Sequence, residues 1–293
     1  MTVSPFDDIR KLAADAPVVA PPAFTTGGDR LAEISAWLTA WTGKTPPAVL
    51  RPVVALYAGA RQGVGPRGYA RERLEAVASG GANVCRIAGA QGAGLEAFDL
   101  AVDRPTPDAT LKASMSEKEC AATMAFGMEA LAKQPDLLIP GVIAAEAERA
   151  VAAIALALFG GEAGDWSDAP EPVAAAVARA AGEADLSDPL QALRELGGRE
   201  TAALVGAILA ARVQKIPVLL DGYAACAAAA VLHALDPALI AHCLAAHVGP
   251  AKGHARLLAV LGKRPLIDLD IAEEEGVGGA TALALVRLAC EVL

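Results

Sequence analysis

The chain has 293 residues, of which 54% are hydrophobic, and this content is ample for a substantial buried core. Its 34 acidic and 25 basic residues give a formal net charge of −9, and no block of basic residues resembles a nucleic-acid footprint. Nucleic acid is therefore not an expected partner.

Signals for secretion or membrane insertion are not found in the sequence. The first residues, MTVSPFDDIRKLAADAPVV, lack the continuous apolar segment of a signal peptide. The most apolar runs, 202–211 and 222–232, are shorter than the ~20 residues that a spanning helix needs. The five cysteines are scattered, odd in number and without a C-x-x-C pair, as is typical of reduced thiols. We therefore expect a cytoplasmic protein that is not embedded in a membrane.

The N-terminal segment is distinct from the rest of the chain. Residues 1–30 carry four prolines and few paired apolar positions, which predicts an arm or a loosely docked segment. Apolar residues then recur at helical spacing from Leu31 to Trp41 and stop before Gly43, which predicts an amphipathic helix. The folded domain is expected to begin at residue 31.

Three short apolar runs, each ending on glycine or containing it near the end, predict buried strands. They are VVALYAG (53–59), LLIPGVI (137–143) and IPVLLDG (216–222). Long alanine-rich helical stretches follow the second and third runs, and this alternation predicts an α/β fold with a parallel sheet. Residues 65–83 are expected to form a loop, a helix and a Gly-Gly break, and residues 160–172 a polar surface loop.

Candidate binding residues follow the predicted strands, because ligands of open parallel sheets collect beyond the carboxyl ends of the strands. Gly59, Gly141 and the pair Asp221–Gly222 are expected on that rim. Asp221 either orients a ligand hydroxyl or the loops of the site, or it caps the helix that follows; the sequence leaves both open.

The four histidines lie within 22 residues, but their separations of 9, 5 and 7 match no familiar zinc spacing. No metal site is therefore expected. His247 and His254 fall in AAHVGPAKGH, whose glycine and proline content is typical of a loop, where binding residues concentrate.

Motifs for nucleophilic catalysis and for phosphate loops are weak. There is no G-x-S-x-G elbow and no cysteine in an activating motif. Neither G-x-x-x-x-G-K-[ST] nor G-x-G-x-x-G is found after a predicted strand, and GVGPRG (63–68) and GVGG (276–279) are only loosely similar. An acyl-enzyme, a P-loop or a dinucleotide cofactor site is not indicated.

The stretch DIAEEEGVGGATALAL (270–285) places three carboxylates before a predicted helix. Acidic residues at a helix start complement the helix dipole, which is the structural interpretation. The functional interpretation is that Glu275, beside glycines that admit a ligand, is a general base in a pocket. We also expect the adjacent like charges of residues 273–275 to raise one another's pKa, so that part of the cluster is protonated near neutrality.

Taken together, several motifs resemble the nicotinate-nucleotide:dimethylbenzimidazole phosphoribosyltransferases of cobalamin biosynthesis, from about residue 28 onward. They are the tryptophan-containing first helix, VVALYAGARQGV (53–64), SGGAN (79–83), DPL…LGGRETAALVGAILAA (188–211), KIPVLLDGY (215–223), AAHVGPAKGH (245–254) and EEGVGGA (274–280). The resemblance implies a three-layer, Rossmann-like α/β fold, with a parallel sheet, flanking helices and a small helical subdomain from the N- and C-terminal segments, over residues 31–293. It also implies a homodimer.

The same resemblance implies that phosphoribose passes from nicotinate mononucleotide to a benzimidazole-type base without a cofactor. Glu275 matches the glutamate of the family's L-G-E-G-[ST]-G-A motif, which takes the proton of the attacking base. The residues expected to bind substrate are Gly59, Gly80, Gly81, Gly141, Asp221, Gly222, His247, Gly276 and Gly278.

The chain also departs from the family at several positions, most of which grip the donor phosphate. Ala60–Arg61 replaces the Asp-His of F-A-G-D-H-G-V, and 138–146 keeps only Gly141 of G-E-M-G-I-G-N-T-T. No lysine occurs between Lys133 and Lys215. A desolvated phosphate needs several charge-assisted donors, and the sequence leaves open whether Arg61 or Arg149 supplies them.

Two alternatives to a divergent phosphoribosyltransferase follow from these departures. One is a catalytically impaired homologue that acts as a binding or regulatory subunit, paired with an intact paralogue. The other is a small-molecule enzyme that reuses the pocket for a ligand without a phosphate.

Overall fold

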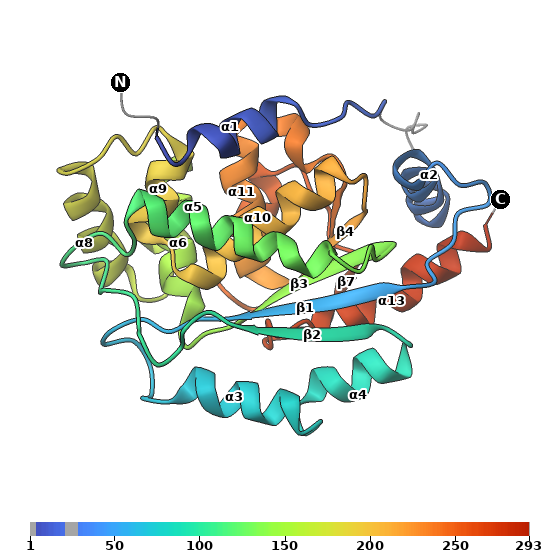
Figure 1. Cartoon of the computed structure of the whole chain (residues 1–293), viewed down its shortest axis with the longest axis horizontal. Helices are drawn as coiled ribbons and strands as arrows, with labels where there is room; N and C mark the ends of the chain where they lie inside the picture. The colour runs from blue at the N-terminus through green and yellow to red at the C-terminus, as the bar shows by residue number, and fades with distance from the viewer. Residues whose placement is uncertain (1–3, 21–28, 293) are drawn as a thin grey trace.

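A five-stranded parallel sheet forms the centre of the molecule in the computed structural model, which describes residues 4–20 and 29–292 (Figure 1). The strands run in the order β2-β1-β3-β4-β5. Their bounds are Pro52–Ala58 for β1, Gly94–Asp99 for β2, Leu137–Ile143 for β3, Val218–Leu220 for β4 and Cys243–Ala245 for β5. The predicted parallel α/β fold is confirmed, and the three predicted strands are β1, β3 and β4. Strands β2 and β5 were not predicted.

Both faces of the sheet are buried, because successive side chains of a strand point to opposite faces. In β1, Ala55 and Tyr57 join one apolar core, whereas Val54 and Leu56 join the other. This explains why the strand reads as a continuous apolar run without alternation.

Helices cover the two faces and give the molecule three layers (Figure 1). On one side lie α5 (Glu117–Gly127), α6 (Ala147–Phe159), α8 (Pro170–Ala181), α9 (Pro189–Leu196), α10 (Arg199–Val213) and α11 (Gly222–Leu235). On the other lie α2 (Arg30–Thr42), α3 (Tyr69–Ala78), α4 (Asn83–Ala90) and α13 (Val277–Cys290). The remaining elements are α1 (Asp7–Ala14), α7 (Ala163–Trp166), α12 (His254–Val260), the 3₁₀ helices η1 (Met128–Leu131) and η2 (Pro237–Ile240), and the small parallel pair β6 (His247–Val248) and β7 (Ile267–Asp268).

The predicted first helix is α2, and it packs with α13 from the far end of the sequence, as expected for a group of N- and C-terminal helices. The Asp29 side chain accepts a hydrogen bond from the Leu31 amide at its start, and Gly43 ends it with a φ of 67°. Where this group separates from the main domain stays a prediction.

The expected N-terminal arm contains an unpredicted helix, α1, and Phe6 just before it is fully buried in the main core. Of the arm, residues 1–3 and 21–28 lie outside the described residues. The expectation of a purely polar surface loop at 160–172 was wrong, because α7 inserts Trp166 there. The Trp166 indole is 1% exposed, its Nε1 donates to the Gly160 carbonyl, and the Arg256 guanidinium lies 4.8 Å from its ring centre.

Helices α5 and α10 approach each other closely at two glycines. A Cβ added to Gly206 would lie 1.9 Å from the Met124 carbonyl oxygen, and one added to Gly127 would lie 2.0 Å from the Ala203 carbonyl oxygen. Both obstacles are backbone atoms, so they cannot rotate away. The small residues of α10 thus allow this helix to be buried between α5 and α11.

We expect Gly206→Ala to lower the free energy of unfolding by about 1–3 kcal/mol, because the added methyl group forces the two helices apart. Gly89→Ala is the matched control, since Gly89 lies in α4 with nothing within 4 Å of an added Cβ. It is expected to stabilise the protein by roughly 0.5–1 kcal/mol through lower chain entropy. Urea unfolding measures both changes. A Gly206→Ala variant as stable as Gly89→Ala would contradict the packing described here.

The strand order places the site. Strand β2 lies on one side of β1, and β3, β4 and β5 follow in turn on its other side. The direction in which the chain builds the sheet therefore reverses between β1 and β3, although all the strands are parallel. Loops leaving the carboxyl ends of these two strands diverge, and a crevice opens between them.

Candidate functional site

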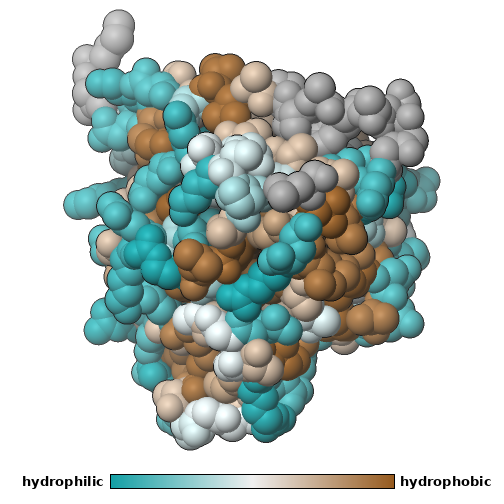
Figure 2. All heavy atoms as spheres, turned by 90° about the vertical axis from the view of Figure 1, so that its right-hand side faces the viewer, coloured by the Kyte–Doolittle hydropathy of each residue, from teal (hydrophilic) through white to brown (hydrophobic). Residues whose placement is uncertain are grey.

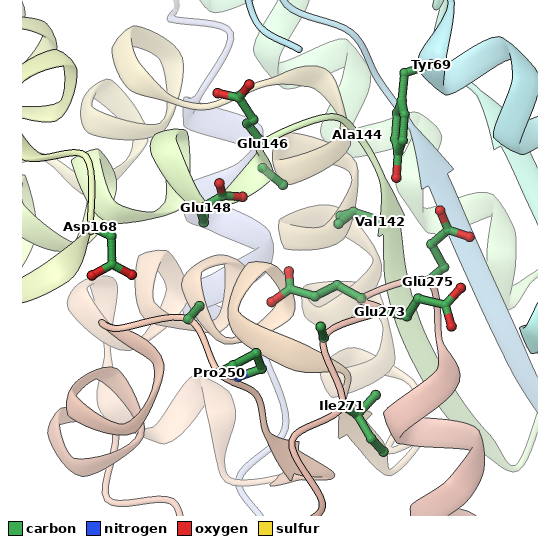
Figure 3. Close-up of a pocket in the computed structure, with 14 residues that line it drawn as sticks. Tyr69, Val142, Ala144, Glu146, Glu148, Asp168, Pro250, Ile271, Glu273 and Glu275 are labelled. Carbon is green, nitrogen blue, oxygen red and sulfur yellow. The ribbon is translucent and has the colours of Figure 1, made fainter. Parts of the chain in front are cut away.

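An acidic cavity of about 500 Å³ opens at the carboxyl ends of the strands, beside Val142 of β3. Figure 3 shows carboxylates arranged around it, with Tyr69 of α3 on one side. Its acidic lining residues are Glu146, Glu148, Asp168, Glu273, Glu274 and Glu275, and none of the lining residues in the described part of the chain is basic. The cavity therefore favours positive charge and disfavours an anion.

Glu275 lines this cavity and is 5% exposed. Arg73 of α3 holds its carboxylate with two hydrogen bonds, from Nε to Oε1 at 2.8 Å and from Nη2 to Oε2 at 2.5 Å. Such a bidentate pair fixes the orientation of the carboxylate as well as its position. Arg73 also lies 3.4 Å from Glu273, whose other oxygen accepts a hydrogen bond from Asn83.

The helix α13 that follows Glu275 is capped by a different acid. Asp221, at the end of β4, is fully buried, and its two oxygens accept hydrogen bonds from the amides of Gly276 at 2.8 Å and Gly279 at 2.6 Å. Its side chain makes no capping bond to α11, the helix that directly follows it. Of the two roles left open by the sequence, Asp221 therefore takes that of orienting the site's own loop. It ties the loop before α13 to the sheet.

Glu274 points the opposite way from its neighbours, toward α11. Its carboxylate accepts hydrogen bonds from the first amides of that helix, Tyr223 at 2.6 Å and Ala224 at 3.1 Å. Burial raises the pKa of Glu274 to about 7, and the nearby charge of Asp221 adds to this rise. The expectation of an acid protonated near neutrality is thus met at Glu274, but the expected cause was wrong, because burial and not the adjacent glutamates dominates.

Two buried histidines pack near Asp221 without lining the acidic cavity: His247 lies beside Asp221, and His254 lies beside His247. His247 is fully buried, and its Nε2 lies 3.5 Å from Asp221 Oδ1, too far for an ordinary hydrogen bond. Burial lowers the pKa of His247, but the charges of Asp221 and Glu274 outweigh it, so the pKa is raised. His254 Nδ1 accepts the Gly249 amide, and burial lowers the pKa of His254 to about 3. His254 is therefore a neutral, structural residue.

A second cavity, of about 680 Å³, adjoins the first and shares Tyr69 with it. We call it the arginine cavity because Arg61, Arg67 and Arg71 line it, along with the loop 59–68 between β1 and α3. Arg149 lines neither of the two cavities and instead pairs with Glu146 at 3.1 Å.

The loop 59–68 corrects one interpretation of the sequence. The interpretation of GVGPRG (63–68) as only loosely similar to phosphate motifs was wrong, because its letters match the G-x-G-x-x-G spacing and follow the predicted strand 53–59. In the structure, Gly63, Gly65 and Gly68 show the G-x-G-x-x-G spacing between strand β1 and helix α3. Their φ angles of 70°, 66° and 85° lie in the region that favours glycine.

The structure brings most of the predicted site residues together beneath the acidic cavity. A Cβ on Gly141 would meet the Gly276 amide, one on Gly222 would meet the Glu274 side chain, and one on Gly278 would meet the His247 ring. These glycines allow the segment before α13 to approach β3, β4 and β6. None of these glycines lines either cavity.

The remaining predicted glycines lie elsewhere. Gly59 lines the arginine cavity, where a Cβ would meet the Glu200 carboxylate. Gly80 and Gly81 form the break between α3 and α4 and line neither cavity. That any of these residues binds substrate stays a prediction. Arg73 was not predicted at all, because it lies 202 residues before its partner and no local pattern links them.

Metal ligands and membrane spans were also sought in the structure. Over residues 4–20 and 29–292, no group of three or more His, Cys, Asp or Glu side chains is arranged to hold a metal ion. Within the same ranges, no helix combines the length and apolar character needed to cross a membrane.

Comparison with known proteins places this geometry in context. A family model described as phosphoribosyltransferase matches residues 27–293. The nicotinate-nucleotide–dimethylbenzimidazole phosphoribosyltransferase of Brucella canis is 45% identical over 97% of this chain and 93% of its own length. The protein of the same name from Rhizobium etli is 45% identical over 99% and 94%. The crystal structure of the enzyme of that name from Thermus thermophilus aligns with a TM-score of 0.82 at 27% identity, covering 97% of this chain and 94% of the other.

Proposed function

This chain belongs to the phosphoribosyltransferase family, and we propose that it transfers phosphoribose from a nicotinate nucleotide to a benzimidazole-type base, with Glu275 as the general base. The observation that carries this proposal is the Glu275 carboxylate, nearly buried and held by Arg73 at the wall of the acidic cavity. The product would supply the lower nucleotide loop of cobalamin.

The chemistry requires one proton transfer. A ring nitrogen of the azole attacks C1′ of the ribose, the bond from C1′ to the nicotinate nitrogen breaks, and its electron pair leaves with nicotinate. The azole N–H proton passes to Glu275, and a carboxylate that is itself only 5% exposed is suited to take it. Positive charge develops on the ribose as the bond breaks, as in other glycosyl transfers, and the surrounding carboxylates stabilise it electrostatically.

An assay of the pure protein tests this function. Nicotinate mononucleotide and dimethylbenzimidazole are incubated with the protein, and nicotinate and ribazole phosphate are followed by chromatography. Release of both in equal amounts is expected. If no nicotinate is released, but the protein stimulates an intact paralogue, the chain is a subunit that does not itself catalyse transfer. If the protein binds dimethylbenzimidazole but not nicotinate mononucleotide, the pocket serves another reaction, one whose substrates carry no phosphate.

We also infer a homodimer that forms through the end of the molecule carrying α2 and α13. Figure 2 faces this end and shows apolar surface gathered there. Leu288 of α13 is 57% exposed, and a shallow groove beside it is lined largely by small or apolar residues, namely Ala32, Ser35, Ala36, Thr39, Ala40, Thr45, Pro47 and Val292. An apolar surface of this kind is typical of a protein interface, and the family resemblance implies that its occupant is a second copy.

Light scattering coupled to size exclusion tests the dimer. The protein is expected to elute at twice its 29.6 kDa mass, and Ala32→Arg to elute at the single mass, because a symmetric interface would bring two added charges together. Ala175→Arg on α8 is the control and is expected to stay dimeric. A dimer that persists in Ala32→Arg would exclude this face.

A cytoplasmic location is inferred as well. All five cysteines are free, which supports a reducing compartment.

A further inference from the structure

The arginine cavity has the backbone features of an anion site. Helix α3, ten residues long, begins there after Gly68; its Tyr69 amide donates to the Pro66 carbonyl at 3.3 Å, and the next two amides, of Ala70 and Arg71, have no partner within the described part of the chain. Tyr69, Ala70 and Arg71 of its first turn line the cavity. A helix start carries partial positive charge and unpaired amide donors, which favour a phosphate oxygen. The three positive-φ glycines let the loop before it pass close to a ligand.

A buried cation adds an independent reason to expect an anion here. The Arg61 side chain is 7% exposed and lines the cavity. One of its terminal nitrogens, Nη2, pairs with Glu200, but Nε and Nη1 have no hydrogen-bond partner among residues 4–20 and 29–292. Leaving such donors buried and unsatisfied costs about 1–3 kcal/mol each. Phosphate oxygens are suited to satisfy them, because arginine binds phosphate through paired donors.

Other arginines extend the positive charge to the entrance. Arg67 is exposed, lines the cavity, and forms no ion pair with the residues that the structure describes. Arg71 is tied by Asp99 at 2.9 Å and Asp103 at 2.6 Å, so its charge is largely offset. Arg67 is therefore the cation available to a ligand arriving from solvent.

Alternative phosphate positions around the crevice are already unfavourable. The first amides of α11 are occupied by the Glu274 carboxylate, so that helix start is filled by the protein itself. Helix α6 begins beside Glu146 and Glu148, whose charges repel an anion. The acidic cavity as a whole has the wrong sign. The arginine in the first turn of α6, Arg149, is already paired with Glu146, whereas α3 begins beside Arg67, which forms no ion pair within the described part of the chain.

We propose that the arginine cavity binds the 5-phosphate of the phosphoribosyl group, through Arg61, Arg67 and the amides at the start of α3. The ribose then passes Tyr69, which borders both cavities, and its C1′ enters the acidic cavity near Glu275. The inference rests on the proposed function for the identity of the ligand. It also resolves the loss of the family's phosphate-gripping positions, because the anion is held by the loop after β1 and not by the loop after β3.

Binding without turnover tests the site. Inorganic phosphate and ribose 5-phosphate are titrated in turn into the ¹⁵N-labelled full-length protein, with no acceptor base present. Amide shifts are expected at Gly63, Gly65 and Ala70. Arg67→Gln is expected to weaken binding about tenfold, the loss of one charge-assisted hydrogen bond. The matched control, Arg51→Gln, removes an exposed arginine at the opposite end of β1 and is expected to bind as the unaltered protein does.

Three outcomes would overturn the site: no binding of either anion, shifts centred on residues 144–148 or 222–224, or equal affinity in Arg67→Gln. Because Arg67 is exposed, its replacement is not expected to disturb folding. The site and the function fail separately. Phosphate binding here without nicotinate release contradicts the transferase alone, whereas transfer with an unchanged KM for the donor in Arg67→Gln contradicts the site alone.

Discussion

Replacing Glu275 with glutamine is expected to reduce kcat for nicotinate release by about 10²- to 10⁴-fold, the usual contribution of a positioned general base. The amide keeps the shape of the carboxylate but cannot take the azole proton. The KM for the nucleotide donor is expected to change little, because the proposed phosphate site is separate from Glu275. Steady-state kinetics with product chromatography measures both constants.

The control for this variant is Glu171→Gln, an exposed glutamate of α8 that lines neither cavity. Glu275→Gln also leaves Arg73 with a neutral partner, so a thermal melt must show that the variant remains folded at the assay temperature. A folded variant with full activity would remove Glu275 from the mechanism.

Replacing Glu274 with glutamine is expected to stabilise the protein relative to the unaltered chain at pH 8, but not at pH 4. Burial raises the pKa of Glu274 from 4.5 to about 7, so ionisation opposes the folded state. Below pH 4.5 the group is protonated in both states and contributes nothing. Between pH 4.5 and 7 the unfolded chain loses the proton first, and stability falls as the pH rises.

The size of the effect follows from the shift in pKa. At 1.36 kcal/mol for each unit, the full penalty above pH 7 is at most about 3 kcal/mol. Urea unfolding at pH 4 and pH 8 measures it. Thr281→Val, a neutral change on the neighbouring α13, is the control, and its effect is expected to be equal at both values. If the free energy of unfolding of Glu274→Gln differs from that of the unaltered protein by the same amount at pH 4 and pH 8, the Glu274 carboxylate is not desolvated.

Local patterns were sufficient to predict much of the frame. The strands β1 and β3 are long apolar runs, and α2 has both an apolar face and a terminal glycine, so each is marked within a few residues of sequence. The edge strand β2 mixes exposed and half-buried positions, and β5 has only three residues. Neither carries a pattern long enough to be recognised, because their burial depends on neighbouring strands.

The candidate site could be predicted only in part. The Glu275 motif is contiguous, and the resemblance to a family depends on such stretches. The Arg73 pair and the orientation of Glu274 are set by contacts between distant elements, which no local spacing encodes. The G-x-G-x-x-G loop at 63–68 lies between a strand and a helix that the sequence also predicts, so this loop could have been recognised from the sequence alone.

The pairing of Arg73 with Glu275 also has a consequence for biosynthesis. A ribosome adds roughly 5–20 residues per second, so the 202 residues between these partners take on the order of 10–40 s to make. Throughout that interval the arginine of α3 has emerged without the carboxylate that it is to hold. Because Glu275 is the proposed general base, a chain whose synthesis stops before residue 275 is expected to lack transferase activity.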